Sequence, residues 1–264
     1  MKRPVVLVIA GHDPSGGAGL TADQRVIEAM GGIAVSVVTA LTIQSTAGVR
    51  AVHPVDPSVL AAQLDEILAD CSPRAVKIGM LGGGRQVAEA ARALRRHCPP
   101  NIVLDPVLAS TGGAPLLDDA GLAALVADLM PLCRVITPNL HEATRLVGFT
   151  VTDIESMQRA AAALQALGVR EVVVKGGHLD GEPADVAALA DGSVVIIRGA
   201  RVKTGHTHGT GCFLSSAIAY GLAMGLPLDQ AARAARTLLV KSLEKPVVIG
   251  RGRGYPGVLA GKHE

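Results

Sequence analysis

The stretch VVLVIAGHDPSGGAGLTADQ, residues 5–24, decides the expected fold. Residues 5–10 form a short apolar run rich in β-branched side chains, which is typical of a buried parallel strand. A glycine-rich loop follows, and residues 20–30 predict a helix that ends at the glycine pair 31–32. A strand, a loop and a helix in this order form the first part of a crossover unit in a parallel sheet.

The same alternation continues along the chain. Further strands are predicted over residues 33–39, 75–78, 102–104, 134–136 and 171–175, with a hairpin over 185–189 and 193–198. Further helices are predicted over residues 57–69, 86–96, 118–130, 139–147 and 154–167, and from about residues 212 and 228. This alternation predicts an α/β, three-layer fold with a mostly parallel central sheet flanked by helices. Without a linker or an internal repeat, we expect one domain over residues 1–264.

The composition excludes several classes of protein. Hydrophobic residues make up 49% of the 264 residues, charged residues make up 18%, and the formal net charge is +2, so a disordered chain is excluded. Aromatic residues are only 2% and no Lys/Arg run stands out, which gives no support for nucleic-acid binding.

The sequence also bears on location. No apolar run reaches the about 18 residues that a membrane-spanning helix needs. Residues 1–4 run directly into the first strand without a signal-peptide cleavage site. The four cysteines lack metal-ligand or redox spacing and fit reduced thiols. We therefore expect a cytoplasmic protein that does not bind membranes.

Polar or flexible residues follow the predicted strands. In chain order they are His12, Asp13, Gln44, Gly79, Met80, Asp105, Asn139, Glu142 and Lys175. In open α/β sheets, ligands bind at the carboxyl ends of the strands. The pattern favours a ligand site at this edge, although surface loops are in general polar and glycine-rich.

The segment HTHGTGC, residues 206–212, precedes a long apolar helix. Backbone N–H groups at a helix start are unpaired and favour negative charge, so the segment predicts an anion site. Cys212 lies in the first turn, where the helix is expected to lower the thiol pKa. Two interpretations stay open: Cys212 is a general base, or it is a small buried residue.

Two carboxylates, Asp105 and Glu142, follow neighbouring strands. Phosphoryl transfer needs a metal ion to neutralise phosphate charge, and Mg²⁺ prefers carboxylate and water oxygens. Taken singly, Asp105 could equally be a turn residue and Glu142 a first-turn acid of a helix. The phosphate loop G-x-x-x-x-G-K-[ST], the G-x-S-x-G elbow and the H-E-x-x-H motif are all missing from the sequence, which argues against the enzymes that use them.

Several segments together resemble one family. They are IAGHDPSGGAGLTADQ (9–24), VVTALTIQST (37–46), VKIGML (76–81), DPV (105–107), ITPNLHEA (136–143), VVVKGGH (172–178) and THGTGC (207–212). In this order they resemble the hydroxymethylpyrimidine/phosphomethylpyrimidine kinases of the ribokinase-like superfamily. The resemblance implies ATP- and Mg²⁺-dependent phosphorylation of 4-amino-5-hydroxymethyl-2-methylpyrimidine, and then of its monophosphate, in thiamine synthesis.

The resemblance also implies roles for single residues. The pyrimidine would be bound by Gln44, Asp23, Gly11, Met80 and Val107. The anion hole would be made by the N–H groups of Gly209, Gly211 and Cys212, with Cys212 as the base. ATP would be contacted by Lys175, Thr210, Asn139 and Asp105, and Mg²⁺ would be held by Asp105 and Glu142 through water. Whether Lys175 meets phosphate or pairs with a carboxylate stays open.

Four positions depart from the family pattern: His12, Thr111, Ala114 and His206. A lysine that many members carry near Thr111 is missing, which weakens the expectation for the second phosphorylation. Two other functions stay open, a pyridoxal kinase and a silent relative that only binds a pyrimidine. By analogy with the superfamily, we expect a homo-oligomer, most simply a dimer.

Overall fold

In the computed structural model, which describes residues 3–110 and 112–258, a single sheet runs through the centre. Its nine strands are β1 (Val5–His12), β2 (Ile33–Ser45), β3 (Gly48–Pro54), β4 (Ala75–Ile78), β5 (Ile102–Leu104), β6 (Val135–Ile136), β7 (Glu171–Val174), β8 (Ala184–Ala188) and β9 (Val194–Arg198). Their order is β3-β2-β1-β4-β5-β6-β7-β8-β9. The strands from β2 to β7 pair in parallel, whereas β3, β8 and β9 pair antiparallel at the two ends.

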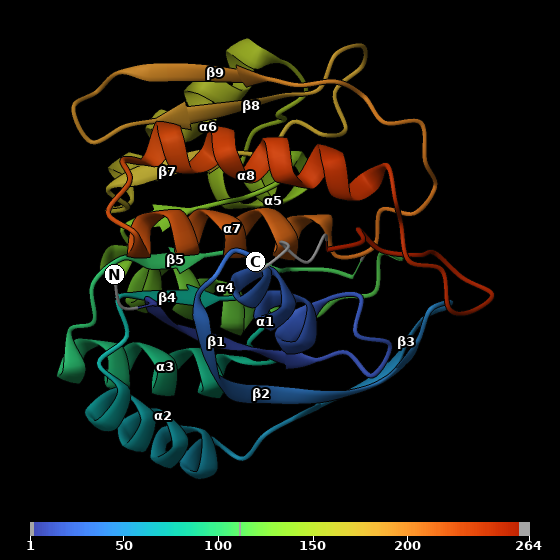
Figure 1. Ribbon diagram of the computed structural model, residues 1–264. Coiled ribbons are helices and arrows are strands. Elements are labelled where there is room, and N and C mark those ends of the chain that lie inside the picture. Colours follow the sequence, from blue (N-terminus) through green and yellow to red (C-terminus); the bar gives the residue numbers. More distant parts are fainter. Residues whose placement is uncertain (1–2, 111, 259–264) are drawn as a thin grey trace.

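Helices cover both faces of the sheet (Figure 1). They are α1 (Gly19–Ala29), α2 (Pro57–Cys71), α3 (Gly84–His97), α4 (Asp119–Ala124), α5 (Leu140–Val147), α6 (Ile154–Ala166), α7 (Thr210–Ala223) and α8 (Leu228–Leu243). One core joins the sheet to α1, α7 and α8, and the other joins it to α2 through α6. The two cores bury opposite faces of the strands, so Val8 and Ile9 of β1 point to different cores.

The expected three-layer α/β fold with a mostly parallel sheet is therefore confirmed. Most predicted helices and strands lie within two or three residues of the observed ones. Residues 118–130 differ, because α4 ends at Ala124 and is followed by a π turn over Leu125–Leu129 and a 3₁₀ turn over Met130–Leu132. Pro131 lacks the N–H that a regular α-helix would use at this point.

The second difference concerns β2 and β3. The prediction ended the second strand at residue 39, but β2 runs to Ser45 and pairs antiparallel with β3, which was not predicted. In Figure 1 this two-stranded ribbon projects beyond the rest of the sheet. Leu41 and Ile43 are more than half exposed there, so the segment lacks the buried apolar run that marks the other strands. Gln44 lies in β2 and not in a loop after it.

Within the described ranges, no helix is long and apolar enough to cross a membrane.

Candidate active site

A cavity of about 1190 Å³ lies at the carboxyl ends of the parallel strands. It collects side chains from segments that are far apart in the sequence. The predicted residues on its wall are Gly11, Gln44, Met80, Asp105, Val107, Asn139, Glu142, Lys175, Gly209, Thr210, Gly211 and Cys212. This meeting follows from the parallel strand order, which brings the loops after β1, β4, β5, β6 and β7 to one edge.

Asp23 is the predicted site residue that does not line the cavity. Its side chain is fully buried in α1, where Asp23 Oδ2 lies 2.6 Å from Lys77 Nζ and Asp23 Oδ1 accepts a hydrogen bond of 2.8 Å from Ser216 Oγ. Lys77 is also fully buried, and it borders the cavity in place of Asp23. Asp23 therefore holds Lys77 and α7 in place beneath the cavity wall, and the expectation that its side chain lines the pocket is wrong.

The start of α7 faces the cavity. Gly209 precedes the helix with a φ of 74°, and a Cβ at this position would lie 1.9 Å from the carbonyl oxygen of Gly17. Only glycine fits that conformation and that contact. The Thr210 N–H donates to the Thr207 carbonyl oxygen at 3.4 Å, whereas the N–H groups of Gly211 and Cys212 lie in the first turn, where a helix offers no acceptor one turn earlier. Together with the helix dipole, they make this wall of the cavity suitable for an anion.

The thiol of Cys212 differs from the expectation based on helix position. Removal of solvent in the cavity wall raises the pKa of Cys212 to about 11. The Lys77 ammonium opposes this rise, whereas the carboxylates of Asp23 and Asp105 add to it. The free protein therefore holds the thiol in its protonated form at neutral pH. The helix start alone does not outweigh desolvation here, so the expected lowered pKa is wrong.

Lys175 sits between the two acidic residues. Its Nζ lies 2.6 Å from Asp105 Oδ1 and 3.9 Å from Glu142 Oε2. A Cβ added to Gly211 would lie 3.1 Å from Lys175 Nζ and 3.6 Å from Asp105 Oδ2, so this ion pair lies directly beside the start of α7. Burial raises the pKa of Glu142 to about 7, Lys175 lowers it in part, and the charge of Asp105 raises it further.

Asn139 and Glu142 also form the start of α5. The Glu142 N–H donates to Asn139 Oδ1 at 2.9 Å, and the Asn139 N–H donates to Glu142 Oε2 at 2.8 Å. This reciprocal pair is a capping box, and it fixes the Glu142 carboxylate in the cavity wall. The structural interpretation of Glu142 as a first-turn acid therefore holds, and it is compatible with a second role toward a ligand.

The carboxylates of Asp105 and Glu142 in the cavity wall are candidate ligands for Mg²⁺. Among the described residues, no group of three or more His, Cys, Asp or Glu side chains could hold a metal ion by itself. Mg²⁺ is usually held by one or two carboxylates together with waters and substrate phosphates. Asp105 and Glu142, which flank Lys175, fit that smaller donor set.

Two residues of the wall were not predicted to have a role. His208 Nε2 lies 2.8 Å from Asp13 Oδ2 and 3.4 Å from Gln44 Nε2. In the sequence, Asp13 stands out only as a polar residue after the first strand, and His208 only as part of the glycine-rich segment. The available signal was their position, because both precede a glycine-rich turn at the predicted ligand edge.

The four departures from the family pattern lie in different places. His12 borders the cavity, whereas His206 turns to the C-terminal segment, where the Gly254 N–H donates to His206 Nδ1 at 3.0 Å. Ala114 closes a turn with Ser110, and Ser110 borders the cavity. Thr111 lies outside the described residues.

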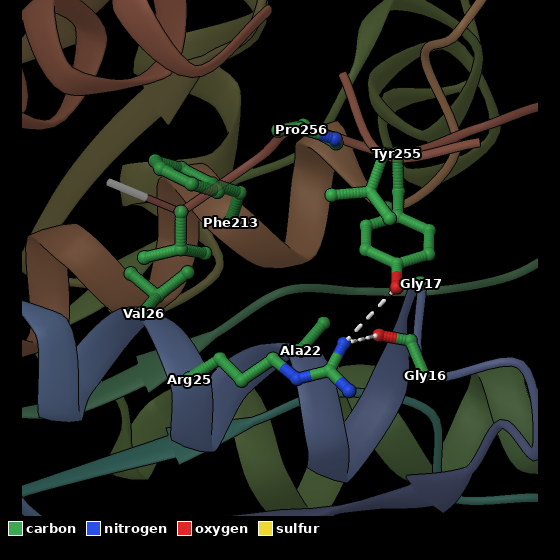
Figure 2. Close-up of a pocket in the computed structure, with 11 residues that line it drawn as sticks. Gly16, Gly17, Ala22, Arg25, Val26, Phe213, Tyr255 and Pro256 are labelled. Carbon is green, nitrogen blue, oxygen red and sulfur yellow. Dashed lines mark hydrogen bonds between the residues drawn. The ribbon is translucent and has the colours of Figure 1, made fainter. Parts of the chain in front are cut away.

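A second, smaller cavity of about 190 Å³ lies behind the start of α7. Figure 2 shows Arg25 reaching from α1 toward Gly16 and Tyr255. Arg25 Nη1 donates to the Gly16 carbonyl oxygen at 2.9 Å and to the Tyr255 hydroxyl at 3.4 Å, and its guanidinium lies 5.8 Å from the centre of the Tyr255 ring. These contacts brace the glycine-rich loop after β1 against the C-terminal segment.

Known proteins are similar to this chain in sequence and in fold. The pattern of the family described as phosphomethylpyrimidine kinase matches residues 13–256. The hydroxymethylpyrimidine/phosphomethylpyrimidine kinase of Rhizobium meliloti is 42% identical over 253 residues, which are 95% of this chain and 95% of that protein. The crystal structure of phosphomethylpyrimidine kinase from Clostridium difficile 630 is similar with a TM-score of 0.81 and 34% identity, over 91% of this chain and all of that one. The ADP complex of Bacillus subtilis pyridoxal kinase is similar with a TM-score of 0.89 and 29% identity, over 98% of each chain.

Proposed function

The chain belongs to the phosphomethylpyrimidine kinase family, and we propose that it uses ATP to phosphorylate 4-amino-5-hydroxymethyl-2-methylpyrimidine and then the resulting monophosphate, in thiamine synthesis. One observation carries the proposal. The start of α7 with Cys212, the Gln44 amide and the Asp105 carboxylate share one cavity. These are an anion site, a group that can recognise a heterocycle, and a partner for phosphate-bound cations.

The pyrimidine is held at the β2 side of the cavity. The Gln44 amide offers a donor and an acceptor side by side, which suits the edge of an aminopyrimidine. Met80 and Val107 supply apolar surface for the ring. A Cβ at Gly11 would lie 3.1 Å from Met80 Sδ, so glycine keeps space open beside the ring.

The first transfer forms one oxygen–phosphorus bond and breaks another. The substrate hydroxyl oxygen bonds to the γ-phosphorus of ATP, the bond from that phosphorus to the β–γ bridging oxygen breaks, and ADP leaves with the electron pair. The hydroxyl proton passes to the Cys212 thiolate, which is the minor form of this side chain at neutral pH. Charge on the transferred group is stabilised by the N–H groups at the start of α7, which are oriented before the reaction begins.

The other wall of the cavity serves the ATP phosphates. Asp105 and Glu142 would hold Mg²⁺ through its water ligands, and the ion would neutralise phosphate charge when bound. Lys175 keeps the two carboxylates in place before ATP binds. Thr210 and Asn139, which also border the cavity, contact the nucleotide in this proposal.

The second transfer needs no base, because the attacking group is already a phosphate oxygen. It needs positive charge instead, since two phosphate groups must approach each other. Besides Lys175, the side chains of Arg201 and Arg253 border the cavity. These cations support the second activity even though the family lysine near residue 111 is missing.

An ADP-release assay with three acceptors side by side tests the proposal. The acceptors are the hydroxymethylpyrimidine, its monophosphate and pyridoxal. We expect the highest kcat/KM with the two pyrimidines. A preference for pyridoxal would assign the chain to pyridoxal phosphorylation instead, an alternative favoured by the structural likeness to the Bacillus subtilis pyridoxal kinase. Tight pyrimidine binding without ADP release would identify a silent binding protein.

Use of ATP, together with four cysteines expected to stay reduced, supports a cytoplasmic location. A homo-oligomer, most simply a dimer, stays a prediction, for which light scattering of the purified protein is the measurement.

A further inference from the structure

The Asp13 carboxylate is saturated with hydrogen-bond donors. Oδ1 accepts from the Ser15 N–H at 2.8 Å and from the Ser15 hydroxyl at 2.7 Å. Oδ2 accepts from the Ala18 N–H at 3.0 Å and faces His208 Nε2 at 2.8 Å. The Asp13 side chain is only 5% exposed. These hydrogen bonds outweigh the effect of burial, which alone would raise the pKa, and hold the pKa of Asp13 below its usual value.

An ionised carboxylate can only accept hydrogen bonds. His208 Nε2 must therefore carry a proton toward Asp13, whether the ring is neutral or charged. This atom cannot accept a hydrogen bond from any other group. The aspartate thus selects the form of the histidine, in the way that a buried aspartate orients a histidine in catalytic triads.

Gln44 also lies near this histidine nitrogen. Its Nε2 is 3.4 Å from His208 Nε2, so two N–H donors face each other in this orientation of the amide. A half-turn about the last side-chain bond exchanges Oε1 and Nε2 with almost no change in shape, and hydrogen bonds decide between the two orientations. With Oε1 toward His208, the amide oxygen shares the single Nε2 proton as a second, weaker acceptor beside Asp13 Oδ2, and the amide nitrogen is turned to the substrate edge.

We propose that the Asp13–His208 pair fixes the Gln44 amide with Oε1 toward His208, and that this orientation makes the site select 4-aminopyrimidines over 4-oxopyrimidines. The inference rests on the proposed function, because it assumes that Gln44 meets the pyrimidine edge. Asp13 and His208 are positioning residues, since they act through Gln44.

The selection follows from the pattern of donors and acceptors. A 4-aminopyrimidine presents an amino donor beside the acceptor nitrogen N3. The fixed amide matches this edge, because Oε1 has a second lone pair for the amino group and Nε2 donates to N3. A 4-oxopyrimidine presents an acceptor beside an N3–H donor, which is the reverse pattern. It therefore meets the amide with two mismatched contacts, and the discrimination expected from one such two-bond pair is about 10–100-fold.

The test compares binding of the two hydroxymethylpyrimidines, 4-amino and 4-oxo, to the full-length protein by calorimetry without ATP. In the wild-type protein we expect the amino compound to bind about 10–100-fold more tightly. His208→Phe keeps a ring but removes the N–H, so the amide can turn and the ratio should fall to within about threefold of one. Asp13→Asn should lower the ratio as well, because an asparagine NH₂ no longer requires a protonated Nε2.

His53→Phe is the matched control, because His53 is an exposed histidine of β3 outside the cavity wall. It should keep the wild-type ratio. If His208 had only a structural role, His208→Phe would weaken the binding of both compounds equally and leave the ratio of their affinities unchanged. An unchanged ratio in His208→Phe and Asp13→Asn variants that melt as folded proteins would overturn the proposal. Because the assay needs no turnover, a wild-type preference without ADP release would count against the kinase function and not against this orientation of Gln44.

Discussion

Lys77 Nζ lies 2.6 Å from Asp23 Oδ2, and neither side chain has any exposed surface. The pair joins β4 to α1, and Ser216 of α7 donates to the other oxygen of Asp23. Ser216 lies one helical turn after Cys212, so the pair ties the anion-binding helix to the sheet directly behind the thiol. Breaking a buried ion pair from one side leaves an uncompensated charge, which is far more costly than replacing both partners.

The buried pair gives the first prediction. Lys77→Met should lower the free energy of unfolding by about 3–5 kcal/mol, because Asp23 is left buried without its cation. The double variant Lys77→Met, Asp23→Leu should regain a large part of that loss. Urea denaturation of the three proteins is the measurement. A double variant that is as unstable as the single one would show that lost packing, and not an uncompensated charge, lowers the free energy of unfolding of Lys77→Met.

The pKa of Cys212 gives the second prediction. Because that pKa is about 11, the thiolate fraction increases with pH throughout the neutral range. The ratio of kcat for the alcohol to kcat for the monophosphate should therefore rise by about tenfold per pH unit between about pH 7 and pH 9. The titration of groups that act in both reactions affects both kcat values equally, so it cancels in this ratio. A ratio that does not depend on pH would exclude thiolate formation as the limiting factor.

The third prediction concerns stability and Glu142. Its pKa in the folded protein is about 7, above the usual 4.5, so the folded state binds the proton more tightly than the unfolded state. The stability that the protonated Glu142 side chain contributes to the folded state is fully present below about pH 4.5, and it is lost as the pH rises through about 7. Glu142→Gln keeps an acceptor for the Asn139 N–H and removes this titration. The melting temperature of the variant relative to wild type should therefore rise between about pH 5 and pH 8. A relative melting temperature that falls over this range would contradict the assignment.

The start of α7 gives the fourth prediction. A methyl group at Gly211 would lie 3.1 Å from Lys175 Nζ, which must shift by a few tenths of an ångström to make room. We expect Gly211→Ala to lower kcat by about 10–100-fold through misplacement of charged groups, with little change in melting temperature. Gly205→Ala in the loop that precedes α7 is the control, because a Cβ there meets no atom within 4 Å. Equal kcat values for the two variants would mean that the space beside Gly211 is not used in catalysis.

The sequence predicted the layers of the fold because buried strands and amphipathic helices leave clear periodic patterns. It missed β3 because that strand is exposed, and it placed Gln44 after β2 instead of within it. An exposed two-stranded ribbon is stabilised by pairing along its backbone, which leaves little trace in the pattern of apolar side chains.

The cavity wall could largely be predicted, since parallel strands bring their following loops to one edge. Asp23 and Cys212 were less predictable for a shared reason. Neighbours from distant parts of the chain decide whether the Asp23 carboxylate faces the cavity or a buried lysine. They also decide whether the pKa of the Cys212 thiol is raised or lowered. Lys77 is the example, because its approach to both residues is set by packing of β4, α1 and α7.

The most direct test of the account is the effect of Cys212→Ala on the two phosphorylations, measured in the same preparation. If Cys212 receives the hydroxyl proton in a cavity that also binds the monophosphate, phosphorylation of the alcohol should fall by about 100-fold or more, the scale of a lost general base. Phosphorylation of the monophosphate should fall by less than about tenfold, because its attacking oxygen carries no proton that must be removed. Equal losses in the two reactions would contradict the role assigned to Cys212 and the chemistry proposed for the start of α7.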